Sequence, residues 1–323
     1  MLEHGGRLRR AALQYGIPLS DWLDLSTGIN PHAWPVPPVP PEAWQRLPEE
    51  HDGLEAAAAQ YYGTDELLPV AGSQAAIQAL PGLIPGERVT VLAPTYAEHA
   101  HAWRDRRVRA CSADTIDAAV ANTDVLLLVQ PNNPSGVQFP HAQLLDWHAR
   151  LVARGGWLIV DEAFIDAAPT ESLASAAGRP NLVVLRSLGK FFGLAGARVG
   201  CVLAPAGLRQ RLAEQLGPWT ISGPARHVAR HAFADTTWQT TMRERLAHEG
   251  VRLADLLRSN GLGAPSGPAL FQWLRHRDAA TLHDRLARQG ILVRRFDEPA
   301  SLRFGLPPDE AGWTRLARAL ANL

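Results

Sequence analysis

The sequence predicts an α/β fold, with a mostly parallel sheet in a large domain followed by a smaller α+β domain. Three observations lead to this prediction. Strongly apolar segments alternate with helical segments from about residue 50 to 205, and polar residues stand directly after several of them. Beyond about residue 225, short strand-like pieces lie among amphipathic helices. Near-continuous apolar strands separated by helices are typical of a parallel sheet that is covered on both faces.

Length and composition restrict the class of protein. A chain of 323 residues can form one large domain and one smaller domain, and 46% apolar with 20% charged residues is ordinary globular composition. The formal net charge of zero implies neither a nucleic-acid nor a polyanion partner. No segment offers the roughly 20 apolar residues that span a bilayer. With no apolar leader pattern at the start, and with Cys111 and Cys201 in apolar surroundings, we expect a cytoplasmic protein without a disulfide.

The expected domains divide the chain into three parts. Residues 1–45 form an N-terminal arm and a Pro-rich connector, 46–220 the large domain, and 221–323 the small domain. Six prolines in 30–44 exclude a helix interior or a central strand there. That segment is either a surface linker or a loop that faces the substrate. We expect the arm before it to pack with the small domain.

The elements of the large domain follow from local patterns. A helix closed by Gly63 is expected first, because glycine readily takes the left-handed conformation that ends helices. The other elements are, in chain order, a strand that turns at Gly72-Ser73 into a helix, strands over 87–94 and 123–131, an amphipathic helix over 141–156, and strands over 157–164 and 181–187.

The small domain is expected to open with a long amphipathic helix over 243–262. Three strand-like pieces then occur, "ALFQWLR", "ILVRRF" and "SLRFGLP", with helices over 278–289 and 309–322. This order of short strands and helices predicts an α+β domain.

Polar residues gather where the strands of the large domain end. In open α/β sheets, ligands bind outside the carboxyl ends of the strands. The residues that follow the expected strands are Gly72, Ser73 and Gln74, then Tyr96, Asn132 and Asn133, Asp161, and Ser187 to Lys190. Because several strand ends carry such groups, the sequence predicts a functional site at this edge of the sheet.

Lys190 is the only lysine of "VVLRSLGKFFGLAGARVG" and follows a buried strand. It could be a surface charge, a phosphate clamp, or a covalent anchor, which requires a lysine that is reachable and partly desolvated. Ser187 and Arg198 nearby could hold a phosphate. A nucleotide P-loop does not fit, because Val184 and Phe191 stand where its first glycine and its hydroxyl residue belong.

Asp161 ends the apolar segment "LIVD". A carboxylate buried there costs several kcal/mol unless a cation or a strong donor pairs with it. A protonated pyridine nitrogen would be such a partner, whereas a structural salt bridge or a metal site is the alternative. No Cys/His cluster accompanies Asp161, which disfavours a metal.

The remaining strand ends carry weaker signals. In "VQPNNPSG" the following proline holds Asn133 extended, where its amide could donate to a phenolate, although a plain turn also fits. "AGSQAA" turns into a helix N-terminus, which suits a phosphate. Tyr96 could stack on an aromatic ring or belong to the core.

Taken together, these motifs resemble the fold-type I pyridoxal-phosphate (PLP) enzymes, the aspartate-aminotransferase-like superfamily. "NNPSG", "DEAF" and "S-x-x-K…R-x-G" occur in the family's order over nearly the whole chain. The resemblance implies pyridoxal 5'-phosphate as cofactor and a homodimer that binds a small-molecule substrate. It assigns residue roles as follows: Lys190 forms the Schiff base, Asp161 pairs with the pyridinium nitrogen, Asn133 bonds the ring oxygen, Tyr96 stacks on the ring, and Gly72, Ser73, Gln74, Ser187 and Arg198 hold the phosphate.

Two groups within this superfamily are candidates. Histidinol-phosphate aminotransferases share most motifs, but "HGGRLRRAALQYGI", "PTYAEHAHAW" and "LGPWTISGPA" look more like the threonine-phosphate decarboxylases of cobalamin biosynthesis. This resemblance implies a lyase that decarboxylates L-threonine O-3-phosphate to (R)-1-aminopropan-2-yl phosphate. It also implies that the substrate is contacted by His4, Gly5, Gly28, Asn133, Arg294 and Arg303.

Two departures from the wider aminotransferase pattern accompany the resemblance. Phe164 and Leu47 stand where many aminotransferases have tyrosines, one bonding the ring oxygen and one reaching the neighbouring subunit's cofactor phosphate. A binding protein without turnover and a phosphate-binding scaffold without cofactor remain as further alternatives.

Overall fold

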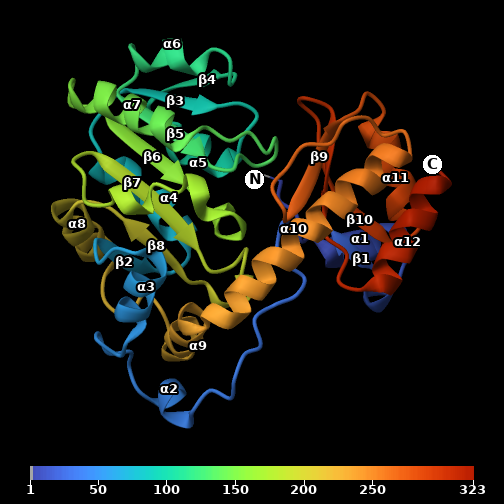
Figure 1. Ribbon diagram of the computed structural model, residues 1–323, viewed down its shortest axis with the longest axis horizontal. Coiled ribbons are helices and arrows are strands. Elements are labelled where there is room, and N and C mark those ends of the chain that lie inside the picture. Colours follow the sequence, from blue (N-terminus) through green and yellow to red (C-terminus); the bar gives the residue numbers. More distant parts are fainter. Residues whose placement is uncertain (1–2) are drawn as a thin grey trace. The chain divides into compact units, whose positions relative to one another are not determined.

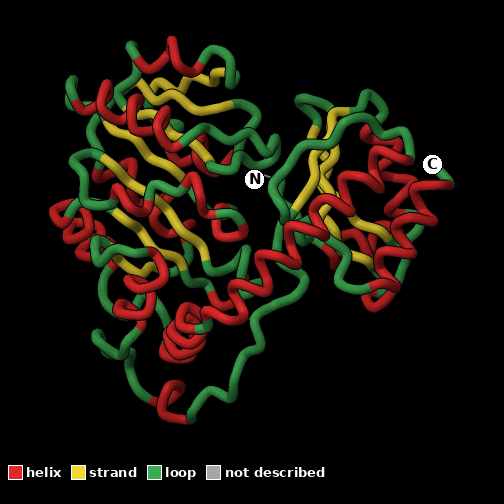
Figure 2. Tube along the Cα trace, in the orientation of Figure 1, coloured by secondary structure: helices red, strands yellow, loops and turns green. Residues whose placement is uncertain are grey.

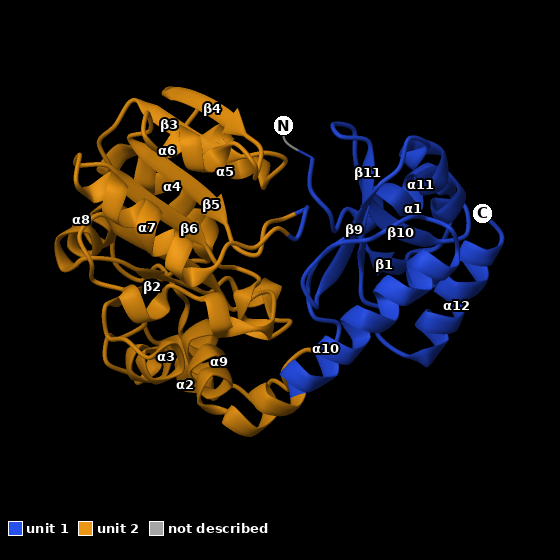
Figure 3. Ribbon diagram, turned by 45° about the horizontal axis from the view of Figure 1, so that its top comes forward, with its two compact units in different colours: residues 1–32, 134–136, 242–323 blue, residues 33–133, 137–241 orange. Residues whose placement is uncertain are grey.

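The computed structural model describes residues 3–323, which form two compact units. The larger unit contains residues 33–133 and 137–241, and the smaller contains residues 3–32, 134–136 and 242–323 (Figure 3). The expected boundaries at residues 45/46 and 220/221 therefore differ from those observed. The Pro-rich connector from residue 33 onward and residues 221–241 belong to the larger unit. Their helices pack there, because α2 (Pro41–Gln45) and α3 (Leu54–Tyr62) contact α9 (Gly223–Ala234).

In the larger unit, one sheet has the strand order β2-β8-β7-β6-β5-β3-β4 (Figure 1). Its strands are β2 (Leu67–Val70), β3 (Arg88–Leu92), β4 (Arg107–Cys111), β5 (Val125–Val129), β6 (Trp157–Asp161), β7 (Leu182–Ser187) and β8 (Gly200–Leu203). The further helices of this unit are α4 (Ser73–Leu83), α5 (Ala97–Ala102), α6 (Ile116–Val120), α7 (His141–Val152) and α8 (Ala206–Leu216).

The central strands of this sheet are parallel, as the sequence predicts. β5, β6 and β7 are fully buried, and helices accompany the strands along the chain (Figure 2). On one face, Ile77 and Leu80 of α4 and Leu212 of α8 pack against Ile159 and Leu185. Gly63 ends α3 in the left-handed conformation, as expected.

Two strands of the larger unit escaped the sequence analysis. β4 carries exposed arginines because it is the edge strand, so its pattern is not apolar. β8 is a short buried strand that follows Arg198 and runs antiparallel to both β2 and β7. Its four residues offer too little pattern to indicate a direction.

The smaller unit has the predicted α+β character. Its sheet has the order β1-β10-β11-β9, from β1 (Leu23–Leu25), β9 (Phe271–Arg275), β10 (Ile291–Phe296) and β11 (Ser301–Gly305). Its helices are α1 (Leu8–Tyr15), α11 (Ala279–Ala287) and α12 (Glu310–Ala321). The arm joins this unit as expected, because β1 pairs parallel with β10. The long helix α10 (Thr236–Ser259) begins earlier than predicted and passes from the larger unit into the smaller at residue 242.

Candidate active site

The predicted strand ends lie at one edge of the larger unit's sheet. β3, β5, β6 and β7 run parallel to one another. β2 points the same way, because β8 runs antiparallel to both β2 and β7. The residues that follow these strands therefore meet at the carboxyl edge, where ligands of α/β sheets bind.

Lys190 follows β7 on a segment that is held in place by buried neighbours. Phe191 and Phe192 are fully buried, and the backbone N–H of Trp34 donates to the Phe192 carbonyl at 2.9 Å. Lys190 itself is half-buried, and its Nζ lies 5.4 Å from the centre of the Phe164 ring. A lysine held on a rigid segment beside an aromatic face is partly desolvated, which is what an amine nucleophile requires.

Asp161 is buried and paired with a residue that the sequence analysis did not identify. His99 of α5 is 1% exposed, and its Nε2 lies 2.8 Å from Asp161 Oδ2. Asp161 Oδ1 accepts a hydrogen bond from the backbone N–H of Ala163 at 3.0 Å. The sequence offered only a weak signal for His99, its place three residues after Tyr96 in "PTYAEH". His99 and Asp161 are 62 residues apart in the chain, so no local pattern indicates their contact.

Small residues bring a helix N-terminus and an arginine together. Gly72 precedes α4, and a Cβ added to it would lie 2.7 Å from Arg198 Nη2. A Cβ on Gly200 would lie 2.7 Å from the backbone nitrogen of Ser73. Arg198 has a φ of 54°, which is uncommon for a residue with a side chain. The first N–H groups of α4 and the Arg198 guanidinium thus form a seat for an anion.

Ser187 extends this seat from β7. It is 9% exposed, and its Oγ accepts the backbone N–H of Gly189 at 3.3 Å. The phosphate residues expected from the sequence thus come from the ends of β2 and β7 and from the turn that precedes β8.

Tyr96 is placed by side chains around it. Its hydroxyl donates to Gln74 Oε1 at 3.3 Å, and Gln74 Nε2 donates to Glu98 Oε2 at 3.0 Å. Burial, followed by the negative charges of Asp161 and Glu98, raises the pKa of Tyr96 to about 12. The Tyr96 phenol is therefore neutral at physiological pH. Gln74, which was expected to hold the phosphate, hydrogen-bonds to the Tyr96 hydroxyl in this structure.

The two asparagines after β5 differ in role. Asn132 is fully buried, accepts from Thr95 Oγ1 at 2.7 Å and donates to the Pro94 carbonyl at 2.8 Å. It ties the end of β5 to the segment that leads to Tyr96. Asn133 is half-buried.

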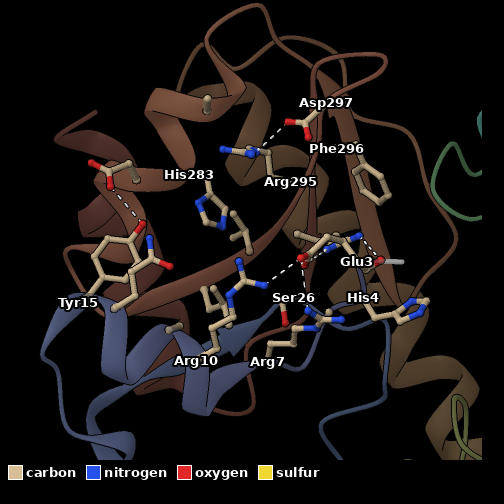
Figure 4. Close-up of a pocket in the computed structure, with 18 of the residues that line it drawn as sticks. Glu3, His4, Arg7, Arg10, Tyr15, Ser26, His283, Arg295, Phe296 and Asp297 are labelled. Atoms are coloured by element: carbon tan, nitrogen blue, oxygen red, sulfur yellow. Dashed lines mark hydrogen bonds and ion pairs between the residues drawn. The ribbon is translucent and has the colours of Figure 1, made fainter. Parts of the chain in front are cut away.

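The smaller unit holds the expected substrate residues other than Asn133, which belongs to the larger unit. A pocket of about 520 Å³ is lined by Gly5 and Arg294, among others. His4 and Ser26, which Figure 4 labels, also line it. Gly5 must be glycine, because a Cβ there would lie 2.2 Å from the Ser26 carbonyl oxygen. Gly28 is buried shortly after β1.

Two arginines face each other in this unit. Arg294 of β10 and Arg303 of β11 are direct cross-strand partners, and Arg303 Nη2 donates to the Ser26 carbonyl at 2.8 Å. Burial, and then the charge of Arg294, lowers the pKa of Arg303 to about 10. Like charges placed directly opposite in a sheet are destabilising, so this pair favours binding of an anion.

The structure describes no helix in residues 3–323 that could cross a bilayer, and no three His, Cys, Asp or Glu side chains there that could share a metal ion. Cys111 and Cys201 are both buried free thiols.

Residues 20–320 match the family described as Aminotransferase class I and II. The chain belongs to this family.

Proteins that are similar to this chain in sequence carry two different names. The chain is 59% identical over 322 residues to a threonine-phosphate decarboxylase of Pseudomonas aeruginosa, covering 99% of this chain and 97% of the relative. It is 43% identical to a threonine-phosphate decarboxylase of a Sinorhizobium species, covering 100% and 98%. A histidinol-phosphate aminotransferase of Legionella pneumophila is 32% identical over 56% of this chain and 50% of the relative.

Solved structures show the same aminotransferase fold. A histidinol-phosphate aminotransferase of Sinorhizobium meliloti in complex with pyridoxal-5'-phosphate gives a TM-score of 0.83 at 22% identity, covering 99% of this chain and 95% of that one. An L-threonine-O-3-phosphate decarboxylase of Porphyromonas gingivalis gives 0.78 at 20% identity, covering 92% and 98%.

Proposed function

We propose that this chain is a PLP-dependent carboxy-lyase that converts L-threonine O-3-phosphate to (R)-1-aminopropan-2-yl phosphate and carbon dioxide, a reaction of cobalamin biosynthesis. The observation that carries the proposal is the 59% identity to a threonine-phosphate decarboxylase over nearly the full length of both chains. The paired arginines of the smaller unit support it, since the substrate has two anionic groups.

The residues of the larger unit fit PLP. The buried carboxylate of Asp161 suits a protonated pyridine nitrogen, and Lys190 suits the aldehyde carbon. Gly72, Ser73, Ser187 and Arg198 suit a phosphate. The absence of a side chain at Gly72 leaves room for the Arg198 guanidinium, which would bind the phosphate, because a Cβ at Gly72 would collide with it. Tyr96 offers a ring for stacking, and Asn133 an amide for the ring oxygen.

The protein would contribute binding, orientation and proton control. PLP, when bound, supplies the electron sink for the pair left on Cα when a bond to Cα breaks. Asp161, fixed by His99, would keep the proton on the ring nitrogen, and Lys190 Nζ would return a proton to Cα. Which bond to Cα breaks would depend on how the protein orients the substrate. Arg294, Arg303 and His4 would therefore decide between losing carbon dioxide and losing the Cα proton, by fixing the carboxylate and the phosphate.

A histidinol-phosphate-type aminotransferase is the second candidate function. It is favoured by the similarity to the Legionella relative and by the motifs that both groups share. In that case Arg294, Arg303 and His4 would orient the substrate so that the Cα proton, and not carbon dioxide, is lost.

We further propose a homodimer, supported by exposed apolar side chains of the larger unit. Trp44, Leu47 and Trp219 are 70%, 63% and 59% exposed. Ala43 and Gly223 bring their segments together, because a Cβ on Gly223 would lie 2.3 Å from the Ala43 carbonyl oxygen. Large apolar side chains that are exposed on neighbouring segments are typical of an interaction site.

The deciding experiment incubates the protein with PLP and L-threonine O-3-phosphate, without a keto acid, and measures carbon dioxide release. A parallel reaction contains histidinol phosphate and 2-oxoglutarate, and Lys190→Ala serves as the inactive control. Carbon dioxide with an aminopropanol phosphate product supports the decarboxylase. Glutamate formation without carbon dioxide would instead establish the aminotransferase.

A further inference from the structure

A buried ion cluster lies beside the candidate active site, and the chemistry described above does not use it. Arg186 of β7 is 3% exposed, and its Nη1 donates to Glu162 Oε2 at 2.9 Å. Its Nη2 donates to Asp166 Oδ1, which is 1% exposed. Glu162 also accepts from Ser172 Oγ at 2.6 Å and from the Leu173 N–H at 2.7 Å.

The cluster occupies the face of the sheet opposite to the active-site residues. Side chains alternate between the faces of a strand, and Leu185 belongs to the core on the face of α4 and α8. Ser187 shares that face, so the side chain of Arg186 points to the other one. Asp161 likewise shares a face with Ile159 of the same core, whereas Glu162 joins Arg186.

The cluster joins two strands that both carry site residues. Asp161 directly precedes Glu162 at the end of β6, and Ser187 directly follows Arg186 at the end of β7. One backbone bond, from Glu162 N–H to the Leu185 carbonyl at 2.8 Å, links the strand ends there. A pocket of about 290 Å³ opens on this face and is lined by Arg186 and Tyr62, among others.

Stability does not explain why such a cluster is present. Two carboxylates face one guanidinium, and burial raises the pKa of Glu162. Buried ion pairs often stabilise a fold no more than apolar residues of the same volume would. What a guanidinium does provide is a rigid fork that fixes the positions of two acceptors.

We propose that Arg186 is a positioning residue: its fork holds the end of β7, with Ser187 and Lys190, in register with the end of β6, with Asp161. The inference rests on the proposed PLP site but not on which reaction follows. It predicts that a positive charge at residue 186 does not maintain PLP binding unless a guanidinium contacts both acceptors.

The test compares Arg186→Lys with Arg226→Lys. Arg226 of α9 is also buried and forks to Asp52 and Glu55, away from the strand ends, so it is a matched control. For each purified protein we would measure the melting temperature without cofactor, the dissociation constant for PLP, and the pH dependence of the visible absorbance of the bound cofactor. Glu162→Gln, which keeps the shape and removes the charge, provides a second variant if Arg186→Lys does not fold.

We expect Arg186→Lys to weaken PLP binding by about tenfold and to shift the pH profile, as loss of an outer-shell partner does elsewhere. Arg226→Lys should lower only the melting temperature. Glu162→Gln should change binding in the same direction by less. If Arg186→Lys, or Glu162→Gln in its place, loses stability but keeps the parental PLP affinity and pH profile, the cluster is merely structural and the proposal is wrong. A parent that binds PLP but releases no carbon dioxide would refute the proposed reaction and leave this comparison intact.

Discussion

His99 is the residue whose importance the structure reveals most directly. Its ring lies 2.8 Å from Asp161 Oδ2, and both side chains are nearly inaccessible to solvent. A buried carboxylate that loses its side-chain partner is costly to keep ionised. The proposed role of Asp161, to hold a proton on the cofactor, would therefore depend on His99.

We predict that His99→Phe weakens PLP affinity by about tenfold, because removing the partner leaves the Asp161 carboxylate under-bonded and free to turn. The measurement is an equilibrium titration of the cofactor-free protein with PLP. His148→Phe is the control, since His148 is also buried and makes one bond, to the Pro180 carbonyl at 2.8 Å, away from the site. Equal affinity in both variants would contradict the role of His99.

Arg303 offers a second prediction, in which stability and function separate. Arg303→Met removes one of two facing like charges, so the melting temperature should stay the same or rise. The KM for the phosphorylated substrate should rise by roughly 100-fold, because one anion partner is lost. Steady-state kinetics and thermal unfolding test this. The control is Arg277→Met, since Arg277 is exposed and does not line the pocket of Figure 4, and an equal rise in its KM would argue against Arg303 as the substrate contact.

At the level of elements, the carboxylate of Asp124 joins the first residues of β3 and β5. Asp124, just before β5, accepts the backbone N–H groups of Glu87 and Arg88 at 3.1 and 2.9 Å. Its Oδ1 also accepts from Arg88 Nε at 3.1 Å. The side-chain bond from Arg88 is the main cause that lowers the pKa of Asp124 to about 2. This carboxylate aligns β3 with β5 at the end opposite to the active site.

We predict that Asp124→Asn lowers the free energy of unfolding by about 1–2 kcal/mol near pH 7. The folded-state pKa is depressed below the usual 3.8, so this stability is present above pH 3.8 and is lost as the pH falls towards 2. Denaturant unfolding from pH 7 to pH 3 should show the difference between parent and variant shrinking at the acid end. Asp146→Asn, on an exposed i,i+4 pair, should cost less than about 0.5 kcal/mol throughout. A difference for Asp124→Asn that does not depend on pH would rule out this explanation.

The order of the elements was largely predictable, whereas two strands of the larger unit were not. The buried strands β5, β6 and β7 were predicted because each is a nearly unbroken apolar run. β4 was missed because its exposed arginines mask the strand pattern, and β8 because it has only four residues. The direction of β8 also explains why β2 delivers Gly72 and Ser73 to the same edge as the parallel strands.

For the whole molecule, the association of two copies is the property most open to test. Trp44 and Trp219 expose large aromatic surfaces on neighbouring segments of the larger unit. Trp219 has a φ of 57°, so the backbone is strained while it presents this side chain to solvent.

We predict that the parent is a dimer at micromolar concentration and that the double substitution Trp44→Glu and Trp219→Ser makes it a monomer, because charge replaces the apolar contact surface. Sedimentation velocity measures this directly. The control Val251→Glu changes a residue that is 62% exposed on α10 in the smaller unit, and it should remain dimeric. A parent that is fully active as a monomer would contradict the proposed dimer.

The sequence by itself determined the α/β class and most of the strands. It also determined that Lys190, Asp161 and the small residues around Gly72 stand at strand ends. These features depend on local apolar runs and on glycine and proline positions, which can be read without knowing the fold. Only the tertiary structure decided which residues meet across long separations. The pairing of His99 with Asp161, the placement of Arg294 opposite Arg303, and the Arg186 cluster behind the site all depend on strand register and direction, which no local pattern specifies.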